Sequence, residues 1–260
     1  MQKRIKVLIS GGSGLIGTYL CSYFDKKKIK YKKIDIKDLN KNYKNFTHFL
    51  HLQFFISKKK KTKFLKKNIS VIKKIISKCE KDKMILVFFS TCSADLKISD
   101  YTISKKRCEQ EITKSSKKRN LTSIILRIFN VYTPNIYSRG AIPELIKKMK
   151  KLKKINIDHY NNCRDFIYID DLTILVKKIF SLRETCKLEV GTGKAVKIID
   201  LARYIKSTFK FNCEIIKSKK VKSSVNSFSR ANIKNLKNKL NWYPKISIKN
   251  GLRKIDKLNK

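Results

Sequence analysis

The chain is poor in acidic residues, proline, glycine and histidine. Its 260 residues contain 19 Asp and Glu against 64 Lys and Arg, with 3 prolines, 8 glycines and 3 histidines. The seven cysteines form no Cys-x-x-Cys pair, so we expect no metal site, and scattered free thiols fit a reducing cytosol. No apolar run approaches the roughly 20 residues that cross a bilayer, and the run before Gly11 is too short for a secretory signal. We therefore expect a cytoplasmic protein without a membrane partner.

The scarcity of acidic residues leaves a formal net charge of +45. A charge of this size is typical of proteins that bind nucleic acids or anionic membranes. The cations are evenly spread, however, with 33 in residues 1–130 and 31 in residues 131–260. This spread favours solvated lysine faces over a nucleic-acid surface. The charge would still help to attract a polyanionic small substrate.

Four of the eight glycines lie within seven residues, 11–17. They follow a short β-branched apolar run, Ile5–Ile9, and precede a helix expected over 18–28. In such a strand–turn–helix unit, backbone N–H groups and the helix N-terminus can approach a pyrophosphate. The alternative is a purely structural turn. We predict a dinucleotide-binding turn whose cofactor contacts are Gly11, Gly14, Leu15, Ile16 and Gly17.

Apolar strands then alternate with amphipathic helices, which predicts an α/β fold: a Rossmann-type doubly wound parallel sheet with a small C-terminal substrate-binding lobe. The expected strands are 29–36, 46–52, 84–89 and 123–128, and the expected helices 68–78 and 101–113. We assign residues 1–145 to the dinucleotide-binding domain and 146–260 mainly to the lobe, with 165–190 returning to the first domain. Ligands would lie at the carboxyl ends of the strands, between the two domains.

The pattern loosens after Pro134. We expect helices at 143–152 and 198–209 and a strand at 164–169. Asp170 or Asp171 would cap a helix that runs to Phe180.

Asp35 ends the second expected strand. An acidic residue at this place can accept hydrogen bonds from a ribose 2′-hydroxyl, which favours NAD over NADP. Two alternatives remain open: an ordinary turn aspartate, or a later motif, Asp35-Ile36-Lys37-Asp38, near the adenine. Our predicted cofactor is NAD, and NADP stays open.

The catalytic candidates are Tyr101 and Lys105, four residues apart and therefore on one face of a helix. A nearby ammonium favours the phenolate, which would make Tyr101 a usable base near neutral pH. Thr91, after the buried strand, would orient a substrate hydroxyl, with Ser93 as the second candidate. In so lysine-rich a chain the pair alone could be a surface coincidence. Its position after Ser90-Thr91 favours a site.

Several longer segments resemble one known family. They are the glycine turn, Thr47-His48-Phe49-Leu50-His51-Leu52, Asn68 opening its helix, Leu126–Pro134, Arg164–Leu172 and Leu240-Asn241-Trp242-Tyr243-Pro244. Together they resemble the NAD-dependent epimerase/dehydratase family, extended short-chain dehydrogenase/reductases that act on nucleotide sugars.

The resemblance implies roles for matching positions. Tyr101 would take a proton from a sugar hydroxyl, Lys105 would hold the nicotinamide ribose, and Leu52 would contact the cofactor. Asn130 would contact the substrate, and Arg164 would grip its diphosphate; the alternative for Arg164 is pairing with Asp165 or Asp170. The resemblance also implies a homodimer that pairs the helices beginning near residues 68 and 101.

One departure from the family bears on the reaction. Members that dehydrate the sugar carry an Asp-Glu pair after the catalytic Thr, and this chain has Cys92 and Ser93 there. Neither is a good general acid at neutral pH, and Cys92 is more simply a small buried filler. We therefore predict a nucleotide-sugar epimerase similar to UDP-hexose 4-epimerases. The alternatives are an NAD(P)H-dependent keto-sugar reductase and a catalytically inactive dinucleotide-binding protein.

Overall fold

The computed structural model describes residues 4–56, 61–96, 98–119, 121–218 and 227–259. Contacts divide the chain into two compact units: residues 1–128 with 175–188, and residues 129–174 with 189–260. The division into domains at residue 145 remains a prediction. Among the described residues, no helix is both long and apolar enough to cross a membrane.

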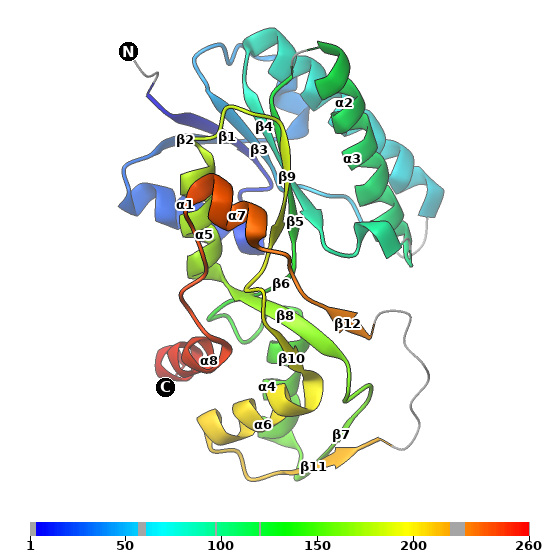
Figure 1. The fold of residues 1–260 in the computed structure, drawn as a ribbon, viewed down its shortest axis with the longest axis vertical. Coiled ribbons are helices and arrows are strands. Elements are labelled where there is room, and N and C mark those ends of the chain that lie inside the picture. Colours follow the sequence, from blue (N-terminus) through cyan, green and yellow to red (C-terminus); the bar gives the residue numbers. More distant parts are fainter. Residues whose placement is uncertain (1–3, 57–60, 97, 120, 219–226, 260) are drawn as a thin grey trace. The chain divides into compact units, whose positions relative to one another are not determined.

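The first unit is built on a six-stranded sheet in the order β2-β1-β3-β4-β5-β9 (Figure 1). The pairings β1–β2, β1–β3, β3–β4 and β4–β5 are all parallel. The predicted Rossmann-type parallel sheet is confirmed. Its strands are β1 (Lys6–Ser10), β2 (Lys30–Ile34), β3 (His48–His51), β4 (Ile85–Thr91), β5 (Ser123–Ile128) and β9 (Cys186–Val190). The accompanying helices are α1 (Leu15–Lys26), η1 (Ile36–Asn40), α2 (Lys61–Asp82), η2 (Ala94–Leu96) and α3 (Asp100–Arg119).

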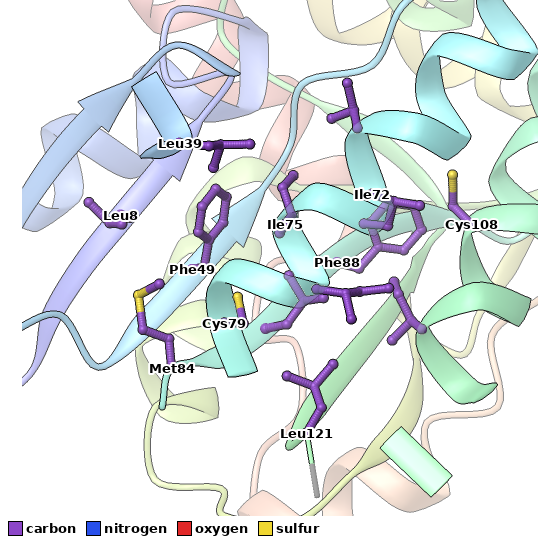
Figure 2. Close-up of a cluster of buried hydrophobic side chains, with 14 of the residues drawn as sticks. Leu8, Leu39, Phe49, Ile72, Ile75, Cys79, Met84, Phe88, Cys108 and Leu121 are labelled. Carbon is purple, nitrogen blue, oxygen red and sulfur yellow. The ribbon is translucent and has the colours of Figure 1, made fainter. Parts of the chain in front are cut away.

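The central strands are buried on both faces because helices cover both. Alternate residues of β1, β3 and β4 point toward α2 and α3, and together they form one apolar cluster (Figure 2). Leu8, Phe49 and Leu86 lie side by side across these strands and are fully buried. On the opposite face, Phe24 of α1 packs against Phe180, with ring centroids 5.7 Å apart. Such two-sided burial explains why the strands read as continuous apolar runs.

The second unit has smaller sheets, in which β8 (Cys163–Tyr168) pairs with three strands. Its partners are β6 (Asn130–Tyr132), β10 (Ala195–Lys197) and β12 (Phe228–Ser229). A separate pair joins β7 (Lys154–Ile157) to β11 (Glu214–Lys217). The helices are α4 (Ala141–Lys151), α5 (Ile169–Ile179), which runs into the first unit, α6 (Ile198–Phe209), α7 (Lys234–Leu240) and α8 (Ile248–Leu258).

Two local predictions were wrong. Helix α2 begins at Lys61, so Asn68 lies inside the helix. Phe64, in the turn before Asn68, is buried and extends the apolar face of the helix toward its start. Helix α5 begins at Ile169, so Asp170 and Asp171 both lie in its first turn and neither is its N-cap. The Asp171 carboxylate accepts hydrogen bonds from the backbone N–H groups of Lys245 and Ile246 at 2.9–3.1 Å, which ties the segment before α8 to α5.

A buried ionic network joins β4, β5 and α3. The Arg127 guanidinium donates to both oxygens of Glu109, at 3.0 and 2.7 Å, and also pairs with Asp95. The hydroxyl of Ser90 donates to Glu109 Oε1 at 2.6 Å. The Glu109 side chain is only 2% exposed, so these donors replace the water that it loses. The network therefore holds the carboxyl end of β4 against α3.

We predict that Glu109→Ala lowers the free energy of unfolding by about 3 kcal/mol, because it leaves the buried Arg127 without its main partner. The matched control is Glu111→Ala on the same helix, where the side chain is 34% exposed and lies 3.6 Å from Lys73. That variant should lose no more than about 1 kcal/mol. Urea unfolding measures both, and equal losses would show that the network does not stabilise the fold.

Candidate functional site

The glycine turn leads from the carboxyl end of β1 into α1. Gly11 has a φ of +80°, and a Cβ there would lie 2.5 Å from the backbone nitrogen of Gln53. A Cβ on Gly17 would lie 2.7 Å from Gly12 Cα. Both positions therefore require glycine, because side chains would collide with backbone that cannot move cheaply.

The turn fits a dinucleotide pyrophosphate. Gly14 is the N-cap of α1 and supplies no side chain to the first turn. The backbone N–H groups of Leu15, Ile16 and Gly17 have no partner within the helix, as in any first turn. A Cβ on Gly14 would meet only Gly11 O, at 3.3 Å. Open space before free N–H groups at a helix N-terminus is what an anionic phosphate needs.

The ends of β1 and β3 are tied together beside this turn. Ser10 Oγ and His51 Nδ1 are 2.6 Å apart, and both residues are buried. Burial, aided by the charge of Lys105, lowers the pKa of His51 to about 3, so its ring is neutral at pH 7. Leu52, a predicted cofactor contact, donates from its backbone N–H to Ser10 O at 3.0 Å. Leu52 therefore lies next to the glycine turn.

Asp35 directly follows β2, at the same edge of the sheet. Its carboxylate accepts a hydrogen bond from Lys37 N at 3.3 Å and caps η1. The side chain is exposed. Asp35 therefore does act as a turn aspartate, as the first alternative supposed. Its exposed carboxylate can still accept a hydrogen bond from a further donor such as a ribose hydroxyl. The aliphatic stem of Lys33 passes Gly12: a Cβ built on that glycine would lie 3.0 Å from Lys33 Cγ.

Tyr101 and Lys105 lie on one face of α3. The Lys105 Nζ is 5.8 Å from the centroid of the Tyr101 ring and donates to Phe89 O of β4 at 2.5 Å. It also lies over the rings of Phe54 and Phe88, at 3.9 and 4.7 Å. Aromatic faces and a carbonyl thus surround the ammonium.

The expected lowering of the Tyr101 pKa is not present in this structure. Burial, with a smaller contribution from Cys92, raises the pKa of Tyr101 above its ordinary value. Burial also lowers the pKa of Lys105, to about 7. Desolvation sets the direction of both pKa shifts, which the sequence spacing could not show.

Thr91 is the last residue of β4, two residues after the carbonyl that holds Lys105. Its hydroxyl oxygen accepts a long hydrogen bond, 3.4 Å, from Ser93 N. Cys92 Sγ lies 3.7 Å from Ser93 Oγ. All three side chains are half-buried, so the choice between Thr91 and Ser93 as the catalytic hydroxyl remains a prediction.

The two predicted substrate contacts lie on neighbouring strands of the second unit. Asn130 of β6 donates from Nδ2 to Asp165 O at 2.8 Å. Arg164 of β8 donates to Cys163 O at 2.9 Å. Their roles toward a substrate remain predictions. Lys222, considered as a further phosphate ligand, lies outside the described residues.

Sequence reasoning missed two groups that position these residues. Asp165 is fully buried, and its carboxylate accepts hydrogen bonds from Thr192, Gly193 and Ala231 at 2.5–3.1 Å. Asn68 binds both backbone groups of Phe55 at 3.0 Å and so holds the segment that places Phe54 against Lys105. A carboxylate in an apolar strand was a readable signal for Asp165, whereas the partners of Asn68 are set by folding alone.

Comparison with known proteins agrees with this geometry. The family model described as "NAD dependent epimerase/dehydratase family" matches residues 7–185, more than half of the chain. The chain belongs to this family. The match covers the glycine turn, Thr91 and the Tyr101–Lys105 pair.

Individual relatives of this epimerase/dehydratase chain cover parts of it. A CDP-abequose synthase of Salmonella muenchen is 33% identical over 141 residues, 51% of this chain and 46% of that protein. A dTDP-D-glucose 4,6-dehydratase of Dictyostelium discoideum is 25% identical over 265 residues, 77% of this chain and 61% of that protein. The chain thus matches about half to three fifths of the length of these relatives.

The fold is also that of solved structures. A UDP-N-acetylglucosamine 4-epimerase from Methanobrevibacter ruminantium M1 superposes with a TM-score of 0.85, covering 98% of each chain at 20% identity. At this identity the similarity establishes the fold.

The buried ammonium of Lys105 predicts a pH-dependent stability. In the unfolded chain its pKa is about 10.4, against about 7 in the folded protein. Between these values the unfolded chain binds the extra proton, so Lys105 makes the free energy of unfolding rise with pH. From pH 7 to pH 9 the wild type should gain about 2 kcal/mol over Lys105→Met. Urea unfolding at both pH values measures this difference, and parallel curves would contradict it.

Proposed function

We propose that this chain is an NAD-dependent nucleotide-sugar epimerase, similar to UDP-hexose 4-epimerases. The observation that carries the proposal is the position of Lys105: its ammonium is bonded to β4 two residues before Thr91 and lies beside the Tyr101 ring. A hydroxyl, a phenol and an ammonium are thereby held at the carboxyl ends of strands whose first turn fits a pyrophosphate. This set suffices for oxidation and reduction at one sugar carbon.

Each side chain would have a defined task. NAD, when bound, accepts and returns a hydride. Leu15, Ile16 and Gly17 would hold the pyrophosphate through backbone N–H groups, and Asp35 the ribose. Tyr101 would take the proton of the sugar hydroxyl that Thr91 orients.

Lys105 would hold the nicotinamide ribose through N–H groups that its bond to Phe89 leaves free, since an ammonium has three donors. In the second unit, Asn130 and Arg164 would bind the sugar and the diphosphate. A planar guanidinium suits a diphosphate because it can donate two parallel hydrogen bonds.

The residues after Thr91 argue against elimination of water. Cys92 and Ser93 stand where dehydrating members carry an acidic pair, and elimination needs a separate acid and base at adjacent carbons. Hydride transfer followed by return to the other face needs the acid/base group of Tyr101 but no second acid and base at the adjacent carbon.

The alternative is an NADPH-dependent keto-sugar reductase, and one observation favours it. Lys33 passes Gly12 at the end of β2, where a cation can pair with the 2′-phosphate of NADP. An epimerase retains its cofactor through the cycle, whereas a reductase releases it after each turnover. A cytoplasmic location and a homodimer that pairs α2 and α3 also belong to the proposal. A groove of about 590 Å³, lined by residues of both helices, marks that face.

The cofactor test separates the two activities. The purified protein is denatured, and the released dinucleotide is identified by chromatography. Near-stoichiometric NAD supports the epimerase, and a panel of UDP-hexoses then tests turnover. Empty protein that binds NADPH supports the reductase. If neither dinucleotide binds, the site is inactive and both activities are excluded.

We predict that Tyr101→Phe lowers kcat by about 10²–10⁴-fold, because the variant lacks the acid/base proton. Dinucleotide binding should be retained. The matched control is Tyr137→Phe, at a side chain that is 88% exposed in the second unit, and its kcat should stay within about twofold. Unchanged turnover in Tyr101→Phe would remove this residue from the mechanism.

A further inference from the structure

A second concave site lies at the amino ends of the parallel strands, opposite to the ends that carry the glycine turn. A cavity of about 440 Å³ opens where β1, β3 and β4 begin, so the length of the strands separates it from the glycine turn. Its volume lies within the range of small-molecule sites. All of its lining residues belong to the first unit.

The lining is strongly basic. Five cationic side chains contribute to it, and the only acidic side chain among the described residues there is Asp82. The cations are Arg4, Lys6, Lys44, Lys83 and Arg183. None of the five lies within 4 Å of a carboxylate among the described residues, so their charges are not offset by ion pairs.

Asp82 does not neutralise this cavity. Its carboxylate is nearly buried, and Oδ2 lies 3.0 Å from Nζ of Lys78, on the same helix. This contact is an ion pair without hydrogen-bond geometry, since Oδ2 has no hydrogen-bond partner among the described residues. Because Lys78 already offsets the acidic charge, the five cations face the cavity as a net positive set.

Arg183 is held in place before any ligand arrives. Its Nη1 donates to Phe180 O at 2.7 Å and to Leu182 O at 3.0 Å. Its other N–H groups have no partner in the part of the chain that the structure describes. Arg183 and His48 both line the cavity. Burial, with a smaller contribution from the charge of Arg183, lowers the pKa of His48 to about 4.

His48 is fully buried, and its Nε2 has no hydrogen-bond partner among the described residues. It lines the cavity next to Thr47, whose hydroxyl lies 2.8 Å from His48 Nδ1. Phe46, Ile5 and Ile85 add apolar surface. The walls therefore offer several cations and an apolar side.

We propose that this cavity binds a phosphorylated organic molecule that carries at least two negative charges. Several cations match phosphate oxygens, and the apolar side contacts the carbon skeleton. The site is separate from the dinucleotide and substrate residues, so its ligand would add to theirs and would not compete with them.

Binding is tested by calorimetry with fructose 1,6-bisphosphate as the probe, in the presence of saturating NAD and at constant ionic strength. Fructose and pyrophosphate serve as the uncharged and the purely ionic comparison. We expect one site for the bisphosphate, weaker binding of pyrophosphate and none of fructose. No binding of the bisphosphate, or tighter binding of pyrophosphate, would overturn the proposal.

A charge-matched pair of variants locates the site. Lys44→Gln/Lys83→Gln removes two exposed cations of the cavity, and Lys147→Gln/Lys150→Gln removes two exposed cations of α4. The first should weaken bisphosphate binding at least about tenfold, since the loss of one hydrogen bond from a charged group weakens binding by about that factor. The second should change it less than about twofold, as screened remote charges do. Equal effects would assign the binding to overall charge, and no effect of the first would place it elsewhere.

If the first double variant unfolds at a lower temperature than the second, the single variant Lys44→Gln replaces it. Its result is read by the same rule, against Lys147→Gln.

Discussion

The common direction of β1, β3 and β4 is the constraint on which the first unit depends. Parallel pairing brings all carboxyl ends to one edge, so the glycine turn, Leu52 and Thr91 lie along it although they are far apart in sequence. The same pairing brings the amino ends to the other edge, where Lys6 and His48 line the basic cavity. One sheet therefore carries two chemically different edges. A register shift of one residue would turn Phe49 to the opposite face of the sheet and disturb both.

Buried polar groups connect this sheet to its helices. Glu109, Lys105 and Asn68 are all nearly inaccessible to water, and each is satisfied by partners on another element. A buried polar group costs free energy unless it is paired, so these contacts select one arrangement of α2 and α3 against β4. The hydrogen bond from Lys105 to Phe89 O of β4 fixes the position of this catalytic candidate. The burial of Lys105 also lowers the free energy of unfolding near neutral pH. The second unit uses the same principle at Asp165, whose carboxylate collects backbone donors from two loops.

Part of the net charge of +45 is gathered at one place in the folded first unit, the basic cavity. In sequence the lysines are evenly spread, which argues against a dedicated surface. Folding nevertheless gathers five cations from separate segments around one cavity and leaves them unpaired, while Lys78 neutralises the nearby Asp82. Average composition therefore could not show this site.

The sequence by itself determined the family, the parallel sheet and the glycine turn, because these depend on local patterns: apolar strands, glycines where backbone approaches backbone, and a tyrosine–lysine pair one helical turn apart. It did not determine the pKa of Tyr101 or Lys105, because desolvation depends on side chains such as Phe54 that come from distant segments. It also missed the start of α2, where the buried Phe64 stands among lysines. Only the tertiary structure decided which charges are buried, which are paired and which remain open to a ligand, since each depends on contacts between residues far apart in the chain.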